Sequence, residues 1–460
     1  MSLRGRFTLD SLADAALRGT IETVLVIVPD FYGRLLGKRT PVEYFLSNVA
    51  EDGWHICDYV LTCDMEMDPS VGFEFANWEH GYGDLHAVID VSTLRLAAWE
   101  DKTAIVFCDL LSPKTHAPVR VSPRQMLRDQ LAHAAAMGYY AKGGSEYELT
   151  LFDESFEEAE RKGFHDLTPS GTYQEDYHIL KGTRHEPIMS RLRQVLTASA
   201  VPVEFTKGEA GCGQQELNLH FSEVLEQADR NLIYKHAAKE VAAAQDRSVT
   251  FMAKWHHEHS GSSAHLHLSL WNQQDRSSVF AGAVPVGAVV GSDEFRWFLG
   301  GWIKHARELA VCYAPYPASY KRYQSRSWAP TSLAWSSDNR TAGFRVVGEG
   351  NSLRVECRLP GADANPYVAY AASIASGLDG IRNKIEPPAA FEGDIYAARD
   401  LPQIPKSSYE AIEAFANSTF AKEALGADVH AHYLRFVQVE QEKFDAVVTN
   451  WERQRYFERA

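Results

Sequence analysis

Ala264-His-Leu-His-Leu-Ser-Leu270 alternates polar and apolar side chains without interruption. Successive side chains of a β-strand point to opposite faces of the sheet, so His265, His267 and Ser269 share one face and the leucines share the other. The alternation predicts a strand with its leucines in a core and its imidazoles on a polar surface.

Three other segments of the chain repeat this pattern. They are Ser145-Glu-Tyr-Glu-Leu-Thr-Leu151, Gln215-Glu-Leu-Asn-Leu-His-Phe221 and Leu353-Arg-Val-Glu-Cys-Arg-Leu359. In the second, Glu216, Asn218 and His220 are expected on one face and Leu217, Leu219 and Phe221 on the other. A solvated sheet face usually carries Lys, Thr, Ser and Gln, whereas these faces carry mostly Glu, His and Arg.

Convergence of these polar faces would crowd several carboxylates together. Like charges that close cannot all stay ionised without compensation, so either the site protonates or cations fill it. Carboxylate oxygens with an imidazole suit Mg²⁺ or Mn²⁺. Zinc fits less well, because the sequence has no H-E-x-x-H motif and no cysteine cluster.

Arginines are concentrated beside Glu356. A stretch of about 37 residues contains the candidates Arg322, Arg340, Arg345, Arg354 and Arg358. Divalent ions with several guanidinium groups suit phosphoryl transfer, because the charge of the moving phosphoryl group must be neutralised. The chain has no G-x-x-x-x-G-K-[ST] loop, so such a site would be built from sheet side chains. Ordinary solvated sheet faces are the structural alternative.

Composition narrows the class of protein. The chain has 460 residues, is 45% hydrophobic and 23% charged, and has a net charge of −15, which argues against nucleic acid or an anionic membrane as a partner. No apolar run approaches the roughly 18 to 20 residues of a membrane span. Acidic residues occupy the place where a secretory signal has its apolar run. The six scattered cysteines are expected to be reduced, and the protein to be cytoplasmic.

Local patterns predict the order of the elements. A helix is expected from Thr8 to about Leu17, and another from Ser122-Pro123 to a stop at Gly138. Further helical patterns cover residues 185–199, 222–244, 295–311, 365–381, 407–425 and 436–459. Early strands are expected at residues 24–28, 59–61, 85–90 and 103–110. The polar, proline-containing segment 112–118 is the expected domain boundary.

Several motifs together resemble the glutamine synthetase family along essentially the whole chain. They are Gly144-Ser-Glu-Tyr-Glu148, Glu209-Ala-Gly-Cys-Gly-Gln-Gln-Glu216, Phe251-Met-Ala-Lys254 leading to Gly261-Ser-Ser-Ala-His265, Ser319-Tyr-Lys-Arg322, Asp338-Asn-Arg340 with Arg345, and Arg354-Val-Glu-Cys-Arg358, followed by Asn365-Pro-Tyr367 and Gly377-Leu-Asp-Gly380. Each motif is weak alone, but their order is specific.

The resemblance implies an α+β fold with two domains. An N-terminal β-grasp-like domain would cover residues 1–113. A catalytic domain with a curved antiparallel sheet, which binds ATP, metal and glutamate, would cover residues 114–460. The resemblance further implies a homo-oligomeric ring, usually a dodecamer, with active sites between neighbouring subunits.

The resemblance also implies roles for individual residues. Glu148, Glu209 and Glu216 would hold one Mg²⁺ or Mn²⁺, and Glu146, His265 and Glu356 another, with two or three ions per site. Ser260, Gly261 and His265 would face L-glutamate, and Arg322 and Arg358 would clamp its carboxylate. Arg340 and Arg345 would neutralise the transferred phosphoryl group. Glu204, His267, Ser269, Arg345 and Arg354 would contact ATP. The γ-carboxylate would be phosphorylated and then transferred to an amine.

Three positions depart from the ammonia-using pattern. Trp328, in Ser327-Trp-Ala-Pro330, stands where those members have a glutamate that helps to bind ammonium. Ser260 replaces the usual asparagine before the glycine, and Asp58 is only a loose counterpart of the family's ammonium-binding aspartate. This pattern resembles the branch that joins glutamate to organic amines.

Two alternatives stay open at this point. An ordinary glutamine synthetase would use ammonia despite Trp328. A structural relative without activity is disfavoured, because every metal and phosphate position carries a competent residue.

Overall fold

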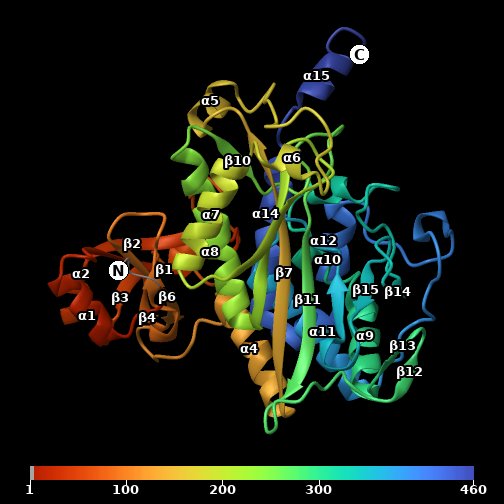
Figure 1. The fold of residues 1–460 in the computed structure, drawn as a ribbon, viewed down its shortest axis with the longest axis horizontal. Helices are drawn as coiled ribbons and strands as arrows, with labels where there is room; N and C mark the ends of the chain where they lie inside the picture. The colour runs from red at the N-terminus through yellow and green to blue at the C-terminus, as the bar shows by residue number, and fades with distance from the viewer. Residues whose placement is uncertain (1–4) are drawn as a thin grey trace.

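A computed structural model describes residues 5–460 and contains two principal β-sheets (Figure 1). The N-terminal sheet contains β1 (Thr23–Pro29), β2 (Leu35–Pro41), β3 (Trp54–Cys57), β4 (Asp84–Ile89), β5 (Arg95–Leu96) and β6 (Thr103–Leu111). Its order is β2-β1-β6-β4-β3, with β5 on β6, and β1 runs parallel to β6. The central strands β1 and β6 are almost entirely buried, in keeping with their continuous apolar runs.

The larger sheet carries all four segments with alternating polar residues. It contains β7 (Tyr139–Phe152), β8 (Val203–Gly208), β9 (Gln214–Glu223), β10 (Ser248–Thr250), β11 (Ala264–Asn272), β14 (Trp335–Ser337), β15 (Phe344–Val347) and β16 (Arg354–Cys357). The order is β14-β15-β16-β11-β7-β9-β8, with β10 on β7. The expected antiparallel pairing holds except between β14 and β15, which are parallel. The hairpin β12 (Val284–Val286)–β13 (Val289–Gly291) stands apart.

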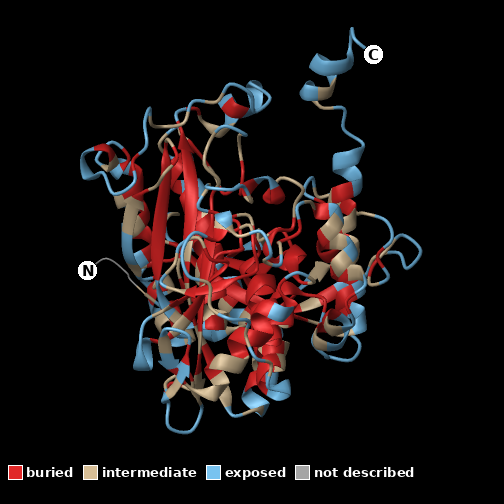
Figure 2. Ribbon diagram, turned by 90° about the vertical axis from the view of Figure 1, so that its right-hand side faces the viewer, coloured by how far each residue is buried: buried red, intermediate tan, exposed pale blue. Residues whose placement is uncertain are grey.

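Helices pack against the apolar face of this sheet. The long ones are α4 (Pro123–Ala136), α7 (Glu186–Ala198), α8 (Val224–Ala243), α9 (Asp293–His305) and α11 (Pro366–Asn383). α4 and α8 contact β7, and α11 packs between α4 and α9. Figure 2 shows buried residues concentrated in the strands and helices at the centre of the molecule, and α11 is buried along most of its length. Leu217, Leu266 and Val355 point into this core with no exposed surface, as the alternation predicted.

The remaining helices are mostly shorter. They are α1 (Leu9–Leu17), α2 (Val42–Tyr44), α3 (Ala50–Asp52), α5 (Phe156–Arg161), α6 (Ile179–Gly182), α10 (Ala310–Tyr313), α12 (Ser408–Ala416), α13 (Thr419–Leu425) and α15 (Asn450–Tyr456), together with the long C-terminal helix α14 (Ala427–Asp445). Thr8 caps α1 and Gly138 follows α4, both as predicted. No helix within residues 5–460 is both long and apolar enough to cross a membrane.

Several element boundaries differ from the sequence-based prediction. Residues 59–61 belong to a 3₁₀ turn (Asp58–Leu61) and not to a strand. The pattern at 295–311 divides into α9 and α10, and that at 407–425 divides where Ser418 caps α13. The predicted helix 436–459 is also two helices, because Thr449 caps α15 with a reciprocal bond to Glu452. Periodicity continues across such breaks, whereas a capping side chain competes with the helical hydrogen bond and starts a new helix.

One prediction about the polar face is wrong. The register of β7 against β9 shifts between Gly143 and Ser145, so the side chains of β9 change faces after Leu219. Phe221 consequently lines a cavity on the polar face, and His220 does not.

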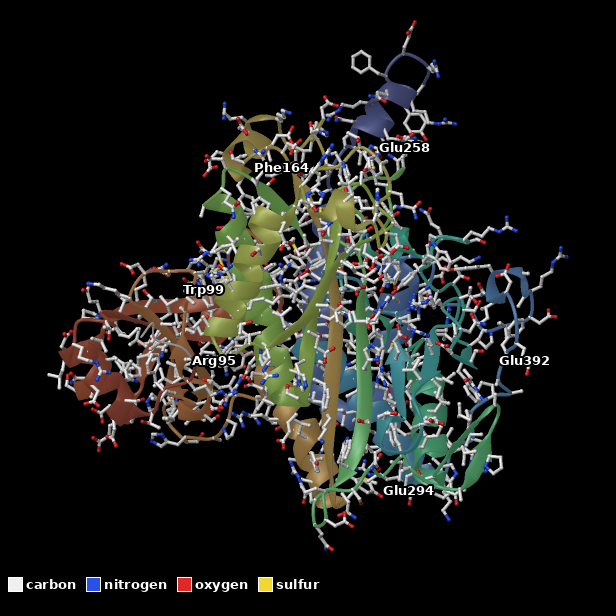
Figure 3. The ribbon with its side chains drawn as sticks, viewed as in Figure 1. Arg95, Trp99, Phe164, Glu258, Glu294 and Glu392 are labelled. Atoms are coloured by element: carbon white, nitrogen blue, oxygen red, sulfur yellow. The ribbon has the colours of Figure 1, made fainter. Side chains whose placement is uncertain are left out.

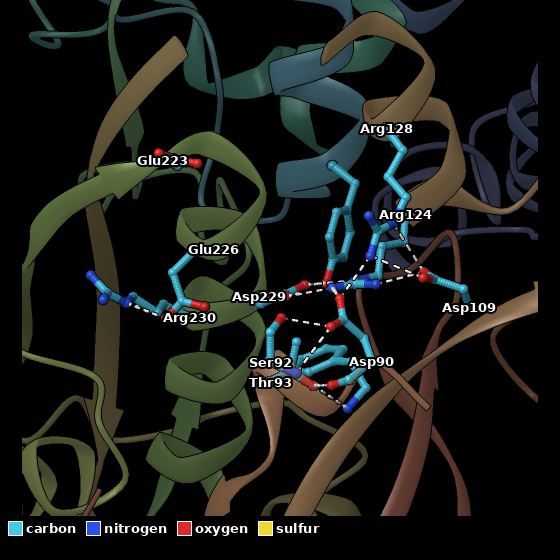
Figure 4. A network of polar contacts seen from close by, with 12 residues as sticks. Asp90, Ser92, Thr93, Asp109, Arg124, Arg128, Glu223, Glu226, Asp229 and Arg230 are labelled. Carbon is cyan, nitrogen blue, oxygen red and sulfur yellow. Dashed lines mark hydrogen bonds and ion pairs between the residues drawn. The ribbon is translucent and has the colours of Figure 1, made fainter. Parts of the chain in front are cut away.

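An ion-pair network joins the N-terminal sheet to the helices of the larger sheet (Figure 4). Arg124 on α4 contacts Asp90 (2.8 Å) and Asp109 (2.5 Å) from the N-terminal part, and Asp229 of α8 (2.9 Å). Arg95, labelled in Figure 3, pairs in the same way with Glu226 of α8 at 3.0 Å. Arg124, Arg95 and Asp229 are buried, so the two parts of the chain share a desolvated polar contact.

Candidate active site

Three carboxylates from neighbouring strands meet at one end of the polar face. Glu148 on β7 lies opposite Glu216 on β9, and Glu209 follows β8 directly. One ligand oxygen from each lies within 4.8 Å of the others. The strand register therefore builds the cluster that the sequence predicted.

Burial, with crowding by like charges, raises the pKa of two members of this cluster. Burial, and then the charge of Glu209, raises the pKa of Glu148 to about 8. Burial, and then the charges of Glu146 and Glu209, raises the pKa of Glu216 to about 10. The cluster is short of positive charge, which is the condition under which a carboxylate cage accepts a hard divalent ion.

A second cluster lies on β7, β11 and β16. Glu146, His267 and Glu356 each offer an atom within 4.8 Å of the others. His265 Nδ1 lies 3.2 Å from Glu146 Oε2 and 3.5 Å from Glu356 Oε1. The structure thus brings together the predicted set Glu146, His265 and Glu356, and adds His267, which the sequence had placed only at ATP.

This second cluster is already compensated by cations. Arg358 Nη1 donates to Glu356 Oε1 at 2.6 Å, and Arg345 Nη1 donates to Glu356 Oε2 at 2.9 Å. Burial raises the pKa of Glu356, but Arg358 and His265 outweigh it and lower the pKa to about 2. For Glu146, hydrogen bonds to His265 and His267 likewise overcome burial and hold the pKa well below its usual range.

Both clusters open into a cavity of about 570 Å³. Arg340, Arg345 and Arg358 line it, as do Ser260 and Gly261. Trp328 stands on its wall with 60% of its surface exposed and a left-handed backbone, φ +63°. A bulky residue in that conformation is held there by its surroundings: Arg358 Nη2 donates to its carbonyl at 3.4 Å, and Tyr396 donates to the next carbonyl, that of Ala329, at 2.8 Å.

Arg322, predicted to clamp the carboxylate of glutamate, lies in the wall of the cavity. Its guanidinium donates to the carbonyls of Arg358 (3.2 Å), Leu359 and Pro360 (2.9 Å), and it is almost fully buried. Gly261 packs directly against its side chain. In this structure Arg322 supports the cavity wall, whereas Arg358 faces the cavity.

A second cavity of about 370 Å³ adjoins the first and shares Glu146 and Asn218 with it. Four of the five residues predicted at ATP line it: Glu204, His267, Ser269 and Arg354. Arg345 lines the larger cavity instead. Phe221 and Trp271 add aromatic surface to it, and Lys142 Nζ lies 3.5 Å from the centroid of the Trp271 ring.

Asp58 lies apart from these residues within one chain. It belongs to the N-terminal part, where its carboxylate accepts a hydrogen bond from the Gly83 amide at 3.0 Å. Of the described residues, those that line the two cavities do not include Asp58.

Several cavity residues were not singled out from the sequence. They are Asp176, Tyr177, Phe205, Lys207, Gln214 and Phe221. Lys207 carried a usable signal, because it precedes Glu209 by two residues on an extended segment and so shares its face. Gln214 Nε2 donates to Glu148 Oε2 at 2.8 Å, a contact that only the folded chain makes.

The residues present fit divalent ions. Among residues 5–460, the buried Nε2 of His265 has no hydrogen-bond partner, and the carboxylate donors are hard oxygens. Glu148, Glu209 and Glu216 would hold one ion, and Glu146, His265 or His267, and Glu356 another.

Comparison with known proteins agrees with this geometry. Residues 120–456 match the family profile described as the glutamine synthetase catalytic domain. This chain belongs to the glutamine synthetase family. Members of the family are ligases that form carbon–nitrogen bonds, depend on ATP and use divalent metals, so the protein is an enzyme of that kind.

Individual relatives lie in the amine-using part of the glutamine synthetase family. The chain is 42% identical over 441 residues to gamma-glutamylethanolamide synthetase GlnA4 of Streptomyces coelicolor, covering 96% of this chain and 94% of the relative. It is 33% identical to glutamate–isopropylamine ligase of a Pseudomonas species over the full length of both. A solved structure titled GmaS/ADP complex superposes with a TM-score of 0.84 at 26% identity, covering 97% of this chain and 99% of the other.

Proposed function

We propose that this enzyme joins the γ-carboxylate of L-glutamate to an organic amine, with ATP converted to ADP and phosphate. The observation that carries the proposal is Trp328, whose exposed indole lines the substrate cavity. In the ammonia-using members of the family, the sequence pattern has a carboxylate at this position. The names of the two relatives, an ethanolamide synthetase and an isopropylamine ligase, point the same way.

The reaction runs in two steps. A γ-carboxylate oxygen attacks the γ-phosphorus of ATP, and the bond to ADP breaks. The amine nitrogen then attacks the carbonyl carbon of γ-glutamyl phosphate, phosphate leaves, and the nitrogen gives up a proton. Phosphorylation is needed because a free carboxylate is a poor acyl donor, and the site must exclude water until the amine arrives.

The chain's residues have distinct tasks in these steps. The two carboxylate clusters would hold Mg²⁺ or Mn²⁺, two or three per site, and such ions supply positive charge to the phosphates. Arg340 and Arg345 would face the phosphoryl group in flight, while Arg358, with Ser260 and Gly261, would orient glutamate. Glu204, His267, Ser269 and Arg354 would bind ATP in the smaller cavity.

The amine side of the cavity is aromatic. Trp328, Tyr177 and Phe205 all line it and are more than half exposed. An ammonium ion needs a carboxylate to offset its desolvation, whereas an alkyl or aryl amine has carbon to bury and, if protonated, gains a cation–π contact. This composition favours an amine with carbon atoms over ammonia.

The decisive experiment is an amine panel. Purified enzyme, glutamate, ATP and Mg²⁺ are incubated with ammonium, ethanolamine, isopropylamine, putrescine or aniline, and phosphate and the γ-glutamyl product are measured. The proposal expects one organic amine to exceed ammonium clearly in kcat/KM. Higher kcat/KM for ammonium than for every amine would establish an ordinary glutamine synthetase instead.

The assembly and the domain boundary belong to the same proposal. We infer residues 1–113 and 114–460 as the two domains, in accord with the two sheets and the connection between β6 and α4. A ring of twelve subunits, as the family resemblance implies, would bring Asp58 of a neighbouring subunit to the amine side, where it would take the proton. Mass photometry gives the subunit number directly.

A further inference from the structure

The ammonium group of Lys207 lies between two carboxylates at the edge of the substrate cavity. Its Nζ forms an ion pair with Glu209 and lies 3.0 Å from Asp176 Oδ1. It also stands 4.3 Å above the ring of Tyr177. The Lys207 side chain is only 16% exposed, so water screens these contacts little. One tethered cation is therefore shared by Glu209 and Asp176.

Both oxygens of Glu209 are engaged in this arrangement. Oε1 faces Lys207, and Oε2 accepts a hydrogen bond from the Ala210 amide at 3.3 Å. A divalent ion that takes an oxygen from each of Glu148, Glu209 and Glu216 has to compete with the ammonium for Glu209. Asp176 offers the ammonium a second place, because it already touches Nζ and is not part of the carboxylate cluster.

We propose that Lys207 is a tethered counter-ion that competes with the divalent ion for Glu209 and withdraws to Asp176 when the ion binds. The exchange keeps the charge balanced, since the ion replaces the ammonium at the cluster and Asp176 retains it nearby. Lys207 thereby sets the ion concentration at which the site fills. The inference rests on the proposed ion site at Glu148, Glu209 and Glu216.

Three variants test the proposal, because each has a different expected effect on the affinity for the divalent ion. Lys207→Met removes the competitor and should tighten ion binding about tenfold or more, because a unit charge at contact distance is worth at least that at the edge of a protein. Asp176→Asn leaves the ammonium only Glu209 as a partner and should weaken binding severalfold. In the double variant the effect of Asp176→Asn should disappear, since Asp176 acts through Lys207.

Mn²⁺ binding to the metal-stripped enzyme provides a measurement independent of turnover. Free Mn²⁺ is followed by electron paramagnetic resonance during titration without ATP or glutamate, and the isotherm is fitted with separate classes of site. The Glu216→Gln variant identifies the class that belongs to the cluster of Glu148, Glu209 and Glu216. The second class, at Glu146 and Glu356, serves as an internal reference.

Control variants distinguish the direct contact of Lys207 with Glu209 from a general effect of positive charge and from misfolding. Arg193→Met removes a cation that bonds to Thr206, the neighbour of Lys207, but does not touch the cluster, and it should leave both dissociation constants unchanged. Lys207→Arg keeps the charge and should stay within a few-fold of the natural enzyme. Circular dichroism melting shows whether each variant is folded.

Two results would overturn the inference, and one tests its basis. Equal Mn²⁺ affinity in Lys207→Met and the natural enzyme would show that Lys207 does not compete with the ion. An undiminished effect of Asp176→Asn in the Lys207→Met background would show that the ammonium group does not withdraw to Asp176. If Glu216→Gln abolishes no class of site in the natural enzyme, the proposed ion site itself is wrong, and the Lys207 proposal falls with it.

Discussion

At the scale of single residues, charge compensation differs between the two clusters. Glu356 is neutralised by Arg345 and Arg358, whereas the pKa values of Glu148 and Glu216 are raised and, among residues 5–460, neither carboxylate forms an ion pair. Arg345 holds Glu356 before substrate arrives and is therefore preorganised, so its position would cost nothing further if it meets the transferred phosphoryl group as proposed.

We predict that Arg345→Ala lowers kcat about 100-fold or more and changes the Michaelis constant for glutamate little. A guanidinium that meets charge chiefly in the transition state acts on turnover, and removal of one such donor is worth about 2.7–4 kcal/mol. Arg340→Ala should behave alike. Steady-state kinetics measure both constants. A change confined to the Michaelis constant for glutamate would mean that these arginines bind glutamate in the ground state and not the transferred phosphoryl group.

Glu216 gives a pH-dependent prediction for the metal-free enzyme. Its pKa is about 10 in the fold against an ordinary value of 4.5, so the folded state keeps a proton that the unfolded chain loses. The contribution of Glu216 to the free energy of unfolding is fully present below about pH 4.5 and is lost as the pH rises toward 10. Glu216→Gln, which cannot ionise, should therefore raise the melting temperature in chelator, slightly near about pH 5 and increasingly toward about pH 9.

The same melting experiment checks metal binding. Mg²⁺ should stabilise the natural enzyme at alkaline pH more than it stabilises Glu216→Gln, because an ion that binds only the folded state stabilises it and the variant keeps only the second cluster intact. A melting difference between the two proteins that does not vary with pH would contradict the raised pKa.

Trp328 is expected to control the choice of amine. Trp328→Glu places a carboxylate where an indole stood, so ammonium use should rise and use of the best organic amine should fall, each about tenfold in kcat/KM. Trp328→Leu is the matched control, since it keeps an apolar wall without charge and should keep the preference for organic amines. Unchanged kinetics in both variants would mean that Trp328 does not line the amine pocket.

At the scale of elements, the loop before β11 depends on close packing as much as on chemistry. A Cβ on Gly261 would lie 2.6 Å from Cγ of Arg322 and 2.7 Å from the Ala253 carbonyl. The glycine therefore lets the loop press against the buried arginine that supports the cavity wall. Here the requirement for glycine is spatial, because its φ angle is not in the left-handed region.

Gly261→Ala should accordingly displace the loop and raise the Michaelis constant for glutamate about tenfold. Overpacking of this kind costs about 1–3 kcal/mol, and about 1.4 kcal/mol corresponds to a factor of ten. Gly182→Ala is the control, because a Cβ there meets nothing within 4 Å. Equal glutamate constants in the two variants would show that the loop accommodates the methyl group.

At the scale of the whole molecule, the network around Arg124 connects the N-terminal sheet to α8 (Figure 4). Arg124 is 1% exposed and pairs with Asp229, which is equally buried. Arg128 contacts the same Asp90 and Asp109, but its side chain is 32% exposed. The two arginines therefore form ion pairs with the same two carboxylates, one from a buried position and the other from a partly exposed position.

Arg124→Met should lower the free energy of unfolding by about 3–5 kcal/mol, because it leaves Asp229 as an uncompensated buried charge. Arg128→Met should cost about 1 kcal/mol or less, as exposed pairs do. Urea unfolding followed by fluorescence and circular dichroism measures both. Similar losses in the two variants would contradict the role given to burial.

Local patterns determined much of this protein. The strict alternation in β7, β9, β11 and β16 was enough to predict these strands and the face that carries Glu146, Glu216, His265 and Glu356, because side-chain direction in a strand depends only on sequence position. Motif order then indicated the family, and helix caps such as Thr8 marked where elements begin.

Tertiary structure alone decided how those faces meet. The register shift between β7 and β9 turned Phe221 toward the smaller cavity in place of His220, and strand order placed His267 beside Glu146. The burial of Arg322 and the sharing of Lys207 between Glu209 and Asp176 likewise depend on contacts between segments far apart in the chain. Such contacts follow from pairing and packing, whose energies are set by neighbours that a local pattern does not contain.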